Sequence, residues 1–383
     1  MKLVFLTSIN PHAKRKYLFY RYKYLINFFN KKENKLYYIT FGNHFKIQKH
    51  KNFYIITIRH TPVLRFFILF SFLFHIRSKY LFTDSHEYYL PCAVLFITSI
   101  LKMKYFYEIL DLIEINSITT NYFKRNSIQA KLIKIFAFML YKKASRLYVM
   151  HKEFKKYLVS IGIEREKVKI IHYGSNLFQK IPNSTELLEL KKNLNLAQEK
   201  VLGWFGYFAP HKGILEQLIP AMNLISKEIS DCKLLLIGDG PIKNAIQRKI
   251  QDLNLKNKVI LLNWVDYEKI SLYYLISDII LITASITDSE RYIMPIKLYD
   301  ALYLGRCVII TESPSLSDLF IEKKHLLYCK PGDPYDLAIK VINALHDSDL
   351  IERISKEGKN FAHNYFDLKK NTEKLALDIY SHI

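Results

Sequence analysis

The stretch Pro295–Ile310 constrains the fold more than any other part of the chain. It opens with a proline, which a first helical turn tolerates because the missing N–H would have no helical partner there. Apolar residues then recur at helical spacing through Tyr303, and Gly305 follows where a left-handed residue ends a helix. The apolar run Cys307–Thr311 predicts a buried strand. Together they form one unit of a doubly wound α/β domain, in which ligands bind at the carboxyl ends of the strands.

The first half of the chain also alternates strands with helical segments. Seven strand candidates are rich in β-branched and aromatic residues: Leu3–Leu6, Leu36–Thr40, Phe53–Ile58, Tyr80–Phe82, Tyr105–Glu108, Leu147–Val149 and Val168–His172. A length of 383 residues allows two domains, each with its own core. We expect one α/β domain at 1–180, a polar connection within 179–199 and a second α/β domain at 181–365.

Positive charge is concentrated in the N-terminal half. The net charge is +22, and residues 1–180 alone hold 32 Lys and Arg against 9 Asp and Glu. Such a surface attracts the phosphates of nucleic acid, of anionic lipid or of a lipid-linked acceptor. Because the sequence contains no helix-turn-helix, zinc-finger or RNA-binding motif, we expect no nucleic-acid partner.

Two segments of this half mix basic and aromatic residues. Residues 14–29 place Lys and Arg, among them Arg21, between Tyr and Phe, and residues 65–79 have an apolar centre between basic ends. The pattern is typical of a helix lying on a membrane interface, and equally of a helix with one face in the core. The apolar runs 66–74 and 90–101 are shorter than the roughly 20 residues of a membrane span. We expect a cytoplasmic protein, peripheral on an anionic membrane surface at its cytosolic face.

The cysteines indicate neither disulfides nor a metal site. Cys92, Cys232, Cys307 and Cys329 are far apart and lack metal-ligand spacing, so we expect reduced core residues and no metal. The apolar stretch at the amino terminus is too short for a signal peptide and predicts a strand.

The segment Val201–Gly213 predicts a phosphate site. An apolar strand ends near Gly206, and Lys212-Gly213 leads into a helix. A glycine at the strand end lets the backbone approach a ligand closely, and a Lys ammonium with a helix N-terminus neutralises a diphosphate.

These motifs together resemble the family 4 glycosyltransferases, retaining enzymes of the GT-B fold. Pro295–Gly305 matches the subset that reads Pro-x-Lys-hydrophobic-x-(Glu/Asp) before Ala-x-x-x-Gly, and Lys233–Pro241 resembles the family's strand-Gly-x-Gly-Pro. Tyr107–Asp111 and Val168–Asn176 resemble two strand ends of its first domain. The resemblance implies two Rossmann-like, doubly wound parallel-sheet domains facing a cleft. It also implies that 366–383 is a C-terminal helix crossing back to the first domain.

The resemblance implies that the second domain binds a nucleotide-diphosphate-sugar. Asp300 stands where the family holds the ribose hydroxyls, Val265 where it contacts the base through backbone groups, and Lys297 supplies phosphate charge or is a solvated helix residue. The expected donor-binding residues are Gly206, Lys212, Gly213, Gly238, Asp239, Gly240, Pro241, Val265, Tyr292, Pro295, Ile296, Lys297, Leu298 and Asp300.

Three residues are expected to act in catalysis: Asp111, Lys212 and Glu290. Asp111 stabilises the sugar as it gains positive charge, or caps a helix. Lys212 is expected to stabilise the leaving diphosphate. Glu290 lies two residues before the position, here Tyr292, at which most of the family has a Glu near the donor sugar.

Acceptor binding is expected in the first domain, where the candidates are His12, Lys14 and His86. The cationic residues near His12 replace the Gly-Gly that the family often has and suggest an anionic acceptor. His86 contacts substrate or is a solvated loop histidine.

We therefore expect a retaining transferase that moves a hexose-type sugar from a nucleotide-diphosphate-sugar to a cell-envelope glycan or lipid-linked acceptor, without cofactor or metal. Leu110, Tyr207 and Tyr292 depart from the family pattern and leave open a catalytically degenerate partner of another transferase. The same fold would also serve a nucleotide-sugar epimerase or hydrolase, and the basic N-terminal half would also serve a nucleic-acid-binding protein.

Overall fold

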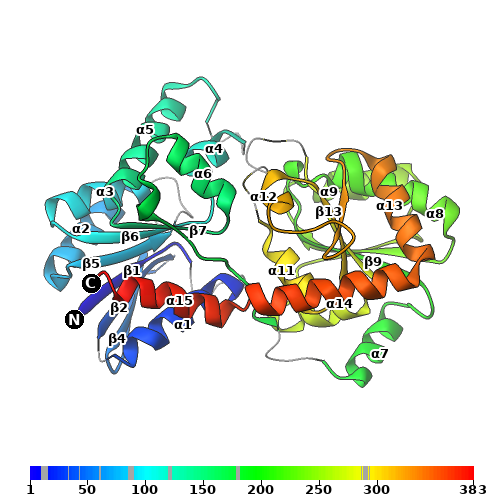
Figure 1. Cartoon of the computed structure of the whole chain (residues 1–383), viewed down its shortest axis with the longest axis horizontal. Coiled ribbons are helices and arrows are strands. Elements are labelled where there is room, and N and C mark those ends of the chain that lie inside the picture. The colour runs from blue at the N-terminus through cyan, green and yellow to red at the C-terminus, as the bar shows by residue number, and fades with distance from the viewer. Residues whose placement is uncertain are drawn as a thin grey trace. The chain divides into compact units, whose positions relative to one another are not determined.

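The computed structural model describes residues 1–9, 16–32, 34–42, 44–59, 62–84, 90–119, 123–177, 182–285, 287, 292 and 294–383. At 16–18, 59, 62–65, 90–92 and 119 it describes the backbone alone. The chain divides into two compact units. Unit 1 contains Met1–Tyr173 and Leu368–Ile383, and unit 2 contains Gly174–Asp367. The C-terminal segment therefore belongs to the same unit as the amino terminus (Figure 1).

Unit 1 is built on an eight-stranded sheet in the order β3-β4-β2-β1-β5-β6-β7-β8. Its strands are β1 (Lys2–Leu6), β2 (Lys35–Gly42), β3 (Lys46–His50), β4 (Phe53–Arg59), β5 (Tyr80–Asp84), β6 (Lys104–Ile109), β7 (Arg146–Val149) and β8 (Val168–Ile170). All pairings are parallel except that of β3 with β4. Strand β3 is not predicted by the sequence because its residues are mostly polar and exposed, without the apolar alternation of a half-buried strand.

The helices of unit 1 pack on its sheet with the C-terminal helix among them. They are α1 (Lys16–Asn30), α2 (Pro62–Ile76), α3 (Leu90–Ile100), α4 (Ile113–Thr119), α5 (Ile128–Lys143), α6 (Lys152–Ser160) and α15 (Leu368–Tyr380). Helices α1 and α15 lie side by side, with the rings of Phe28 and Phe29 both 6.4 Å from that of Tyr380. Leu375 and Ile379 of α15 are buried in the same core cluster as Phe5 of β1.

The basic and aromatic helix α1 has one face in the core. Tyr22 and Phe29 are buried against the sheet. Arg21 is 1% exposed, forms an ion pair with Glu108 of β6, and places its guanidinium 4.7 Å from the centroid of the Tyr173 ring. The structure therefore favours the core-facing interpretation of this segment over a helix lying on a membrane.

Unit 2 is a six-stranded parallel sheet in the order β11-β10-β9-β12-β13-β14. Its strands are β9 (Lys200–Tyr207), β10 (Cys232–Asp239), β11 (Val259–Leu262), β12 (Ile279–Ile282), β13 (Cys307–Thr311) and β14 (Leu327–Cys329). Its helices are α7 (Ser184–Asn193), α8 (Ile219–Glu228), α9 (Lys243–Asp252), α10 (Ile270–Ile276), α11 (Ile296–Tyr303), α12 (Pro314–Ser317), α13 (Pro334–His346) and α14 (Ser348–Tyr365). Helix α7 occupies part of the stretch expected to be a polar connection.

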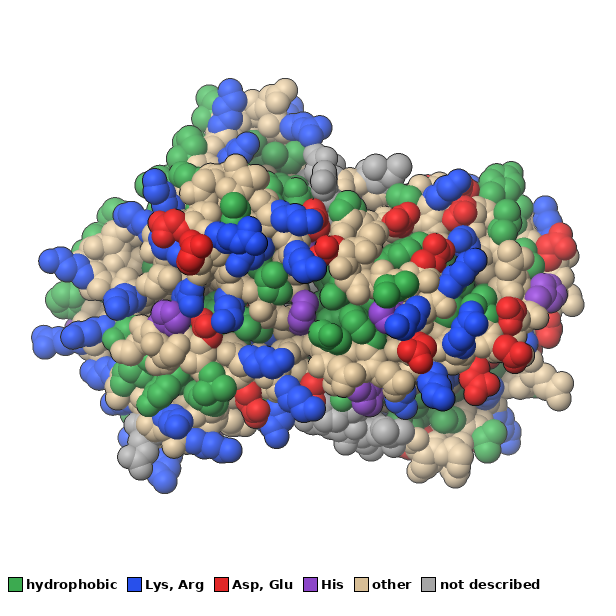
Figure 2. All heavy atoms as spheres, viewed as in Figure 1, with side chains coloured by type: hydrophobic (Ala, Val, Ile, Leu, Met, Phe, Trp, Pro, Cys, Tyr) green, Lys and Arg blue, Asp and Glu red, His purple; other side chains and the backbone are tan. Residues whose placement is uncertain are grey.

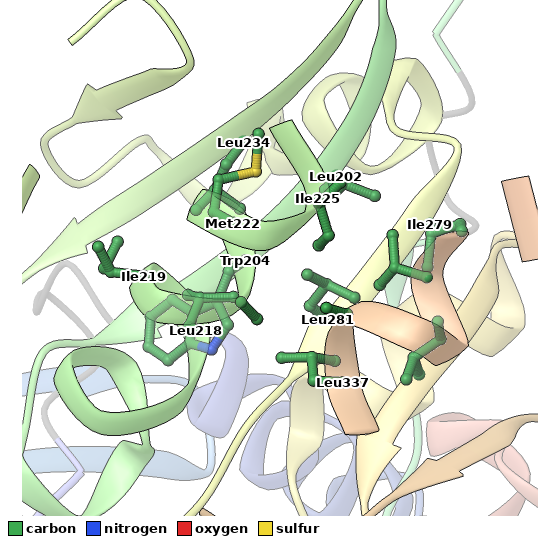
Figure 3. Packing of buried hydrophobic residues seen from close by; sticks show 14 of the residues in the cluster. Leu202, Trp204, Leu218, Ile219, Met222, Ile225, Leu234, Ile279, Leu281 and Leu337 are labelled. Carbon is green, nitrogen blue, oxygen red and sulfur yellow. The ribbon is translucent and has the colours of Figure 1, made fainter. Parts of the chain in front are cut away.

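The helix, glycine stop and strand predicted at Pro295–Ile310 are confirmed as α11, Gly305 with φ +68°, and β13. The core of unit 2 includes buried side chains from β9, β12 and α8, among them Leu202, Leu281 and Ile225 (Figure 3). Trp204 lies beside Leu218 in the same cluster. Large aliphatic side chains thus fill the space between the sheet and its helices.

Three of the four cysteines are described as buried thiols in unit 2. Burial raises the pKa of Cys232, Cys307 and Cys329 to about 12 each, so the thiols stay protonated at neutral pH. The Cys92 side chain lies outside the described residues. Within the described ranges, every helix is too short or too polar to cross a membrane.

Candidate functional site

The carboxyl ends of β9 and β10 meet at two glycines. Gly206 and Gly238 are partners in register. Gly238 has φ +156°, and a Cβ atom there would lie 1.8 Å from the Gly206 carbonyl oxygen. A side chain does not fit at this distance, so Gly238 has a structural role at the sheet edge where a ligand was expected.

Lys212 and Gly213 lie in the turn between β9 and the next helix. Lys212 ends a 3-10 turn, and Gly213 takes a left-handed conformation with φ +65°. A π-helical turn, Ile214–Leu218, follows directly and continues as α8. The Lys212 carbonyl accepts a hydrogen bond of 2.7 Å from the hydroxyl of Thr283. The predicted Lys-Gly entry into a helix is confirmed, and the end of β12 holds it in place.

Lys297 lies in the first turn of α11 and packs against β9. Its Nζ is 3.8 Å from the centroid of the Trp204 ring. A Cβ atom added to Gly206 would lie 3.1 Å from the same nitrogen. The ammonium therefore lies over the indole face, in a cation–π contact beside the end of β9, and is not an extended, fully solvated helix side chain.

Thr283 connects the surroundings of the two lysines, because it is hydrogen-bonded both to Trp204, which Lys297 covers, and to the Lys212 carbonyl. The Trp204 Nε1–H donates to Thr283 Oγ1 at 3.0 Å, and the Thr283 hydroxyl donates to the Lys212 carbonyl. Trp204 is fully buried and Thr283 is 2% exposed. Neither residue was among the site residues predicted from the sequence. The available signal was a polar residue placed directly after the buried strand β12, at the carboxyl edge of a parallel sheet.

Asp300 is also part of α11, one turn after Lys297. It is 5% exposed, and its Oδ1 accepts a hydrogen bond of 2.6 Å from the Ser175 hydroxyl. Burial raises the pKa of Asp300 to about 7, although the Ser175 hydrogen bond acts in the opposite direction. The buried phenol of Tyr274 is near enough for the Asp300 charge to raise its pKa further. Ser175 is a second partner that the sequence did not single out.

The other donor-site candidates occupy the same edge of unit 2. Asp239 accepts a hydrogen bond of 2.9 Å from the Gly240 N–H. Val265 follows β11 and is half-buried. The Leu298 side chain is fully buried, and its N–H donates to the Pro295 carbonyl at 2.9 Å. This amide is therefore already used within the helix.

Other candidate positions are less informative. Pro241 is exposed, Ile296 opens α11, and Tyr292 is half-buried. Four predicted site residues fall outside the described residues: His12, Lys14, His86 and Glu290.

In unit 1, Asp111 follows β6 and precedes α4. It is half-buried, next to the buried Leu110. Glu114, in the first turn of α4, is buried and accepts hydrogen bonds from Tyr141 at 2.8 Å and Tyr157 at 2.9 Å. Burial raises the pKa of Glu114. These contacts anchor the first turn of α4. They therefore also restrict the position of Asp111, which lies two residues before the helix begins.

The unit 2 residues form an arrangement suited to an anion. The Lys297 ammonium, the Lys212 turn, close-packed glycines and the start of a helix lie at the carboxyl edge of one sheet, where positive partial charges of helix N–H groups add to lysine charge. Among the residues that the structure describes, no group of His, Cys, Asp and Glu offers three ligands for a metal ion.

Comparisons with known proteins agree with this fold. Residues 186–361 match the model of the family described as glycosyl transferases group 1. Over 258 residues, 66% of this chain, the sequence is 22% identical to an uncharacterized glycosyltransferase of Methanocaldococcus jannaschii. Over 161 residues, 42% of this chain, it is 29% identical to the alpha-monoglucosyldiacylglycerol synthase of Streptococcus pneumoniae. The alignments span 64% and 34% of the lengths of these two relatives.

Similarity to solved structures extends over the whole chain. The crystal structure of Anabaena HepE in complex with UDP has a TM-score of 0.77 and 15% identity, with 100% of both chains covered. The expected α/β GT-B fold is therefore confirmed, with the one antiparallel strand β3 as a departure. Residues 186–361 thus match the glycosyl transferases group 1 model, in agreement with the resemblance to family 4, and the whole chain shares the GT-B fold of its structural neighbour.

Proposed function

We propose that the chain is a retaining glycosyltransferase that moves a hexose-type sugar from a nucleotide-diphosphate-sugar to a cell-envelope glycan or lipid-linked acceptor. Unit 2 binds the donor, and unit 1 binds the acceptor. The observation that carries the proposal is the placement of Lys297 over Trp204 beside Gly206, with Lys212 held through Thr283 to the same tryptophan.

This placement meets the electrostatic demand of the reaction. The diphosphate gains negative charge as its bond to the sugar breaks, and positive groups fixed in advance at that position lower the barrier. Lys212 and Lys297 supply the charges, and the first N–H groups of α11 and of the helix after Gly213 add to them. Asp111 of unit 1 is the proposed residue for the positive charge that develops on the sugar, and Glu290, which lies outside the described residues, is a further candidate.

The nucleotide carries a ribose and a base, for which Asp300 and the backbone at Val265 are the proposed contacts. Anabaena HepE, which shares the fold, is solved with UDP, so UDP is the first nucleotide to test. In this proposal the Asp300 carboxylate exchanges its Ser175 partner for a ribose hydroxyl, or accepts from both.

The acceptor is proposed to be anionic or lipid-linked and to be met at the cytosolic face of a membrane. The charge of residues 1–180 supports this, because a strongly basic unit attracts phosphate groups. One of the relatives is named for a glucosyldiacylglycerol product, which is a glycolipid.

A catalytically degenerate partner of another transferase is the second candidate. Tyr207, 46% exposed, stands where the family usually has a cation, and Asp300 is already hydrogen-bonded within unit 2. Such a protein would retain the fold and bind no donor.

Thermal stabilisation of the full chain by nucleoside diphosphates and nucleotide-sugars tests the donor site. A ligand at 100 times its Kd adds about 2.7 kcal/mol to the stability of the folded state, which gives a clear shift of the melting temperature. We expect a shift with one donor that is lost in Lys212→Ala and Lys297→Met and retained in Lys256→Ala, which removes an exposed lysine elsewhere in unit 2. No shift with any donor would favour the degenerate partner, and release of free sugar without acceptor would favour a hydrolase.

A further inference from the structure

Helix α5 is apolar on two opposite faces. Its core face consists of Ala130, Ile133, Ala137, Leu140 and Tyr141, all buried. The opposite face repeats at helical spacing and is exposed, with exposed fractions of 73% at Ile128, 47% at Leu132, 55% at Ile135, 36% at Phe136 and 39% at Met139. A surface helix normally places polar residues opposite its core face, so this second apolar stripe needs a partner outside the chain.

The stripe continues onto two neighbouring helices. Phe96 of α3 is 54% exposed, and Phe67 and Phe74 of α2 are 64% and 55% exposed. Ring contact between Phe66 and Phe96, at 5.4 Å, joins α2 to α3. A hydrogen bond of 3.0 Å from Lys143 Nζ to Ser99 Oγ joins α5 to α3. We call the face formed by Phe67, Phe74, Phe96, Ile128, Ile135 and Met139 the flank surface of unit 1.

Positive charge surrounds this surface. Residues 123–152, which include all of α5, contain eight Lys and Arg and no Asp or Glu. Lys131 and Lys142 are exposed and border the apolar stripe of α5 on one side, and Lys143 borders it on the other. In Figure 1 the helices α2, α3 and α5 lie next to one another in unit 1, and in Figure 2 hydrophobic and basic side chains share the outer edge of this unit.

We infer that the flank surface docks unit 1 onto an anionic phospholipid bilayer. Aromatic and aliphatic side chains enter the headgroup region, and the lysines beside them pair with lipid phosphates. A contact with the same surface of a second copy is disfavoured because lysines would face lysines, and residues 123–152 contain no Asp or Glu to pair with them. The inference rests on the membrane-surface part of the proposed function. It replaces the predicted membrane segment 14–29 by α5 and α3, and it keeps the predicted segment 65–79, whose helix α2 contributes Phe67 and Phe74.

Co-sedimentation of the full chain with lipid vesicles, without nucleotide or acceptor, tests the docking surface. We expect binding to vesicles of phosphatidylcholine with phosphatidylglycerol, weaker binding to phosphatidylcholine alone, and a decrease as salt is added. The double variant Ile128→Gln/Ile135→Gln is expected to lower vesicle affinity by about tenfold or more. Lys131→Gln/Lys142→Gln is expected to lower it by about fivefold for each lysine on anionic vesicles only.

Leu188→Gln/Ile339→Gln is the matched control. These two residues are 68% and 57% exposed on α7 and α13 of unit 2, so the substitution removes similar apolar area outside the flank surface. Equal vesicle binding by the control and the Ile128→Gln/Ile135→Gln variant would overturn the inference. So would conversion of a dimer to a monomer by the latter variant with vesicle binding unchanged. Nucleotide binding by the same variants separates failure of this inference from failure of the donor site.

Discussion

Replacement of Thr283 by valine tests whether the two lysines share one support. Valine has nearly the shape of threonine and lacks the hydroxyl, so the packing around Thr283 is retained while two hydrogen bonds are removed. The bonds are those from Trp204 Nε1, at 3.0 Å, and to the Lys212 carbonyl, at 2.7 Å. Because Trp204 is fully buried, its N–H has no access to water in the variant.

The magnitude follows from these two losses. A buried N–H left without an acceptor costs about 1–3 kcal/mol, and a hydrogen bond to a half-buried carbonyl contributes about 0.5–1.5 kcal/mol. We therefore expect Thr283→Val to lower the free energy of unfolding of unit 2 by about 1.5–4.5 kcal/mol. Thr283→Ser keeps the hydroxyl and removes one methyl group, so it should cost only about 1 kcal/mol.

Urea unfolding followed by tryptophan fluorescence measures this difference in unit 2 alone, because both tryptophans of the chain, Trp204 and Trp264, lie there. Trp264 is 45% exposed, and Trp264→Phe leaves Trp204 as the single reporter. The nucleotide Kd of the valine variant should also rise, because the Lys212 turn loses its anchor. Valine and serine variants of equal stability and equal nucleotide affinity would refute the reasoning.

Three further predictions concern single contacts. Gly238→Ala should destabilise unit 2 by more than about 3 kcal/mol in the same urea titration, because the added Cβ would overlap a carbonyl oxygen. Gly332 has φ +68° and open space around it, so Gly332→Ala should lower the stability by only about 1–2 kcal/mol. Asp300, with its pKa raised to about 7, binds a proton more tightly in the folded than in the unfolded state. The free energy of unfolding should therefore fall by about 3 kcal/mol from pH 4 to pH 7, and Asp300→Asn should remove this fall. Arg21→Leu removes the cationic partner of the buried Glu108 carboxylate and should lower the free energy of unfolding of unit 1 by about 3–5 kcal/mol, measured by circular dichroism. The double variant Arg21→Leu/Glu108→Leu should recover most of this stability. A double variant as unstable as the single one would contradict the ion-pair account.

The sequence predicted those parts of the fold that have local causes. Helix α11, the Gly305 stop and β13 follow from spacing and residue type within one stretch. The core position of Arg21 has no such cause, because its partner Glu108 lies on a distant strand and the pattern around Arg21 fits a membrane helix equally well. Strand β3 is held by backbone pairing with β4 at an exposed sheet edge, which leaves no apolar alternation in the sequence.

The same distinction applies to the candidate site. Strand-end glycines and a Lys-Gly turn indicate where a phosphate group binds, and they are visible in the sequence. What directs the lysines is supplied by side chains from other strands: the indole of Trp204 for Lys297, and the hydroxyl of Thr283 for the Lys212 turn. A single sequence does not reveal that Trp204, Thr283 and Lys297 meet.

The departure at Tyr207 has a physical counterpart in this arrangement. The family usually has an arginine there, and this chain presents an exposed tyrosine. Lys297 reaches from α11 to the side of Gly206, the residue before Tyr207, so positive charge is restored at the end of β9 from the neighbouring helix. A side chain at Gly206 would press on that ammonium, which gives this glycine a second role besides its approach to β10. In the proposed donor site, the cation on the helix would take the place of the phosphate ligand missing from the strand, which leaves two positive charges for two phosphates.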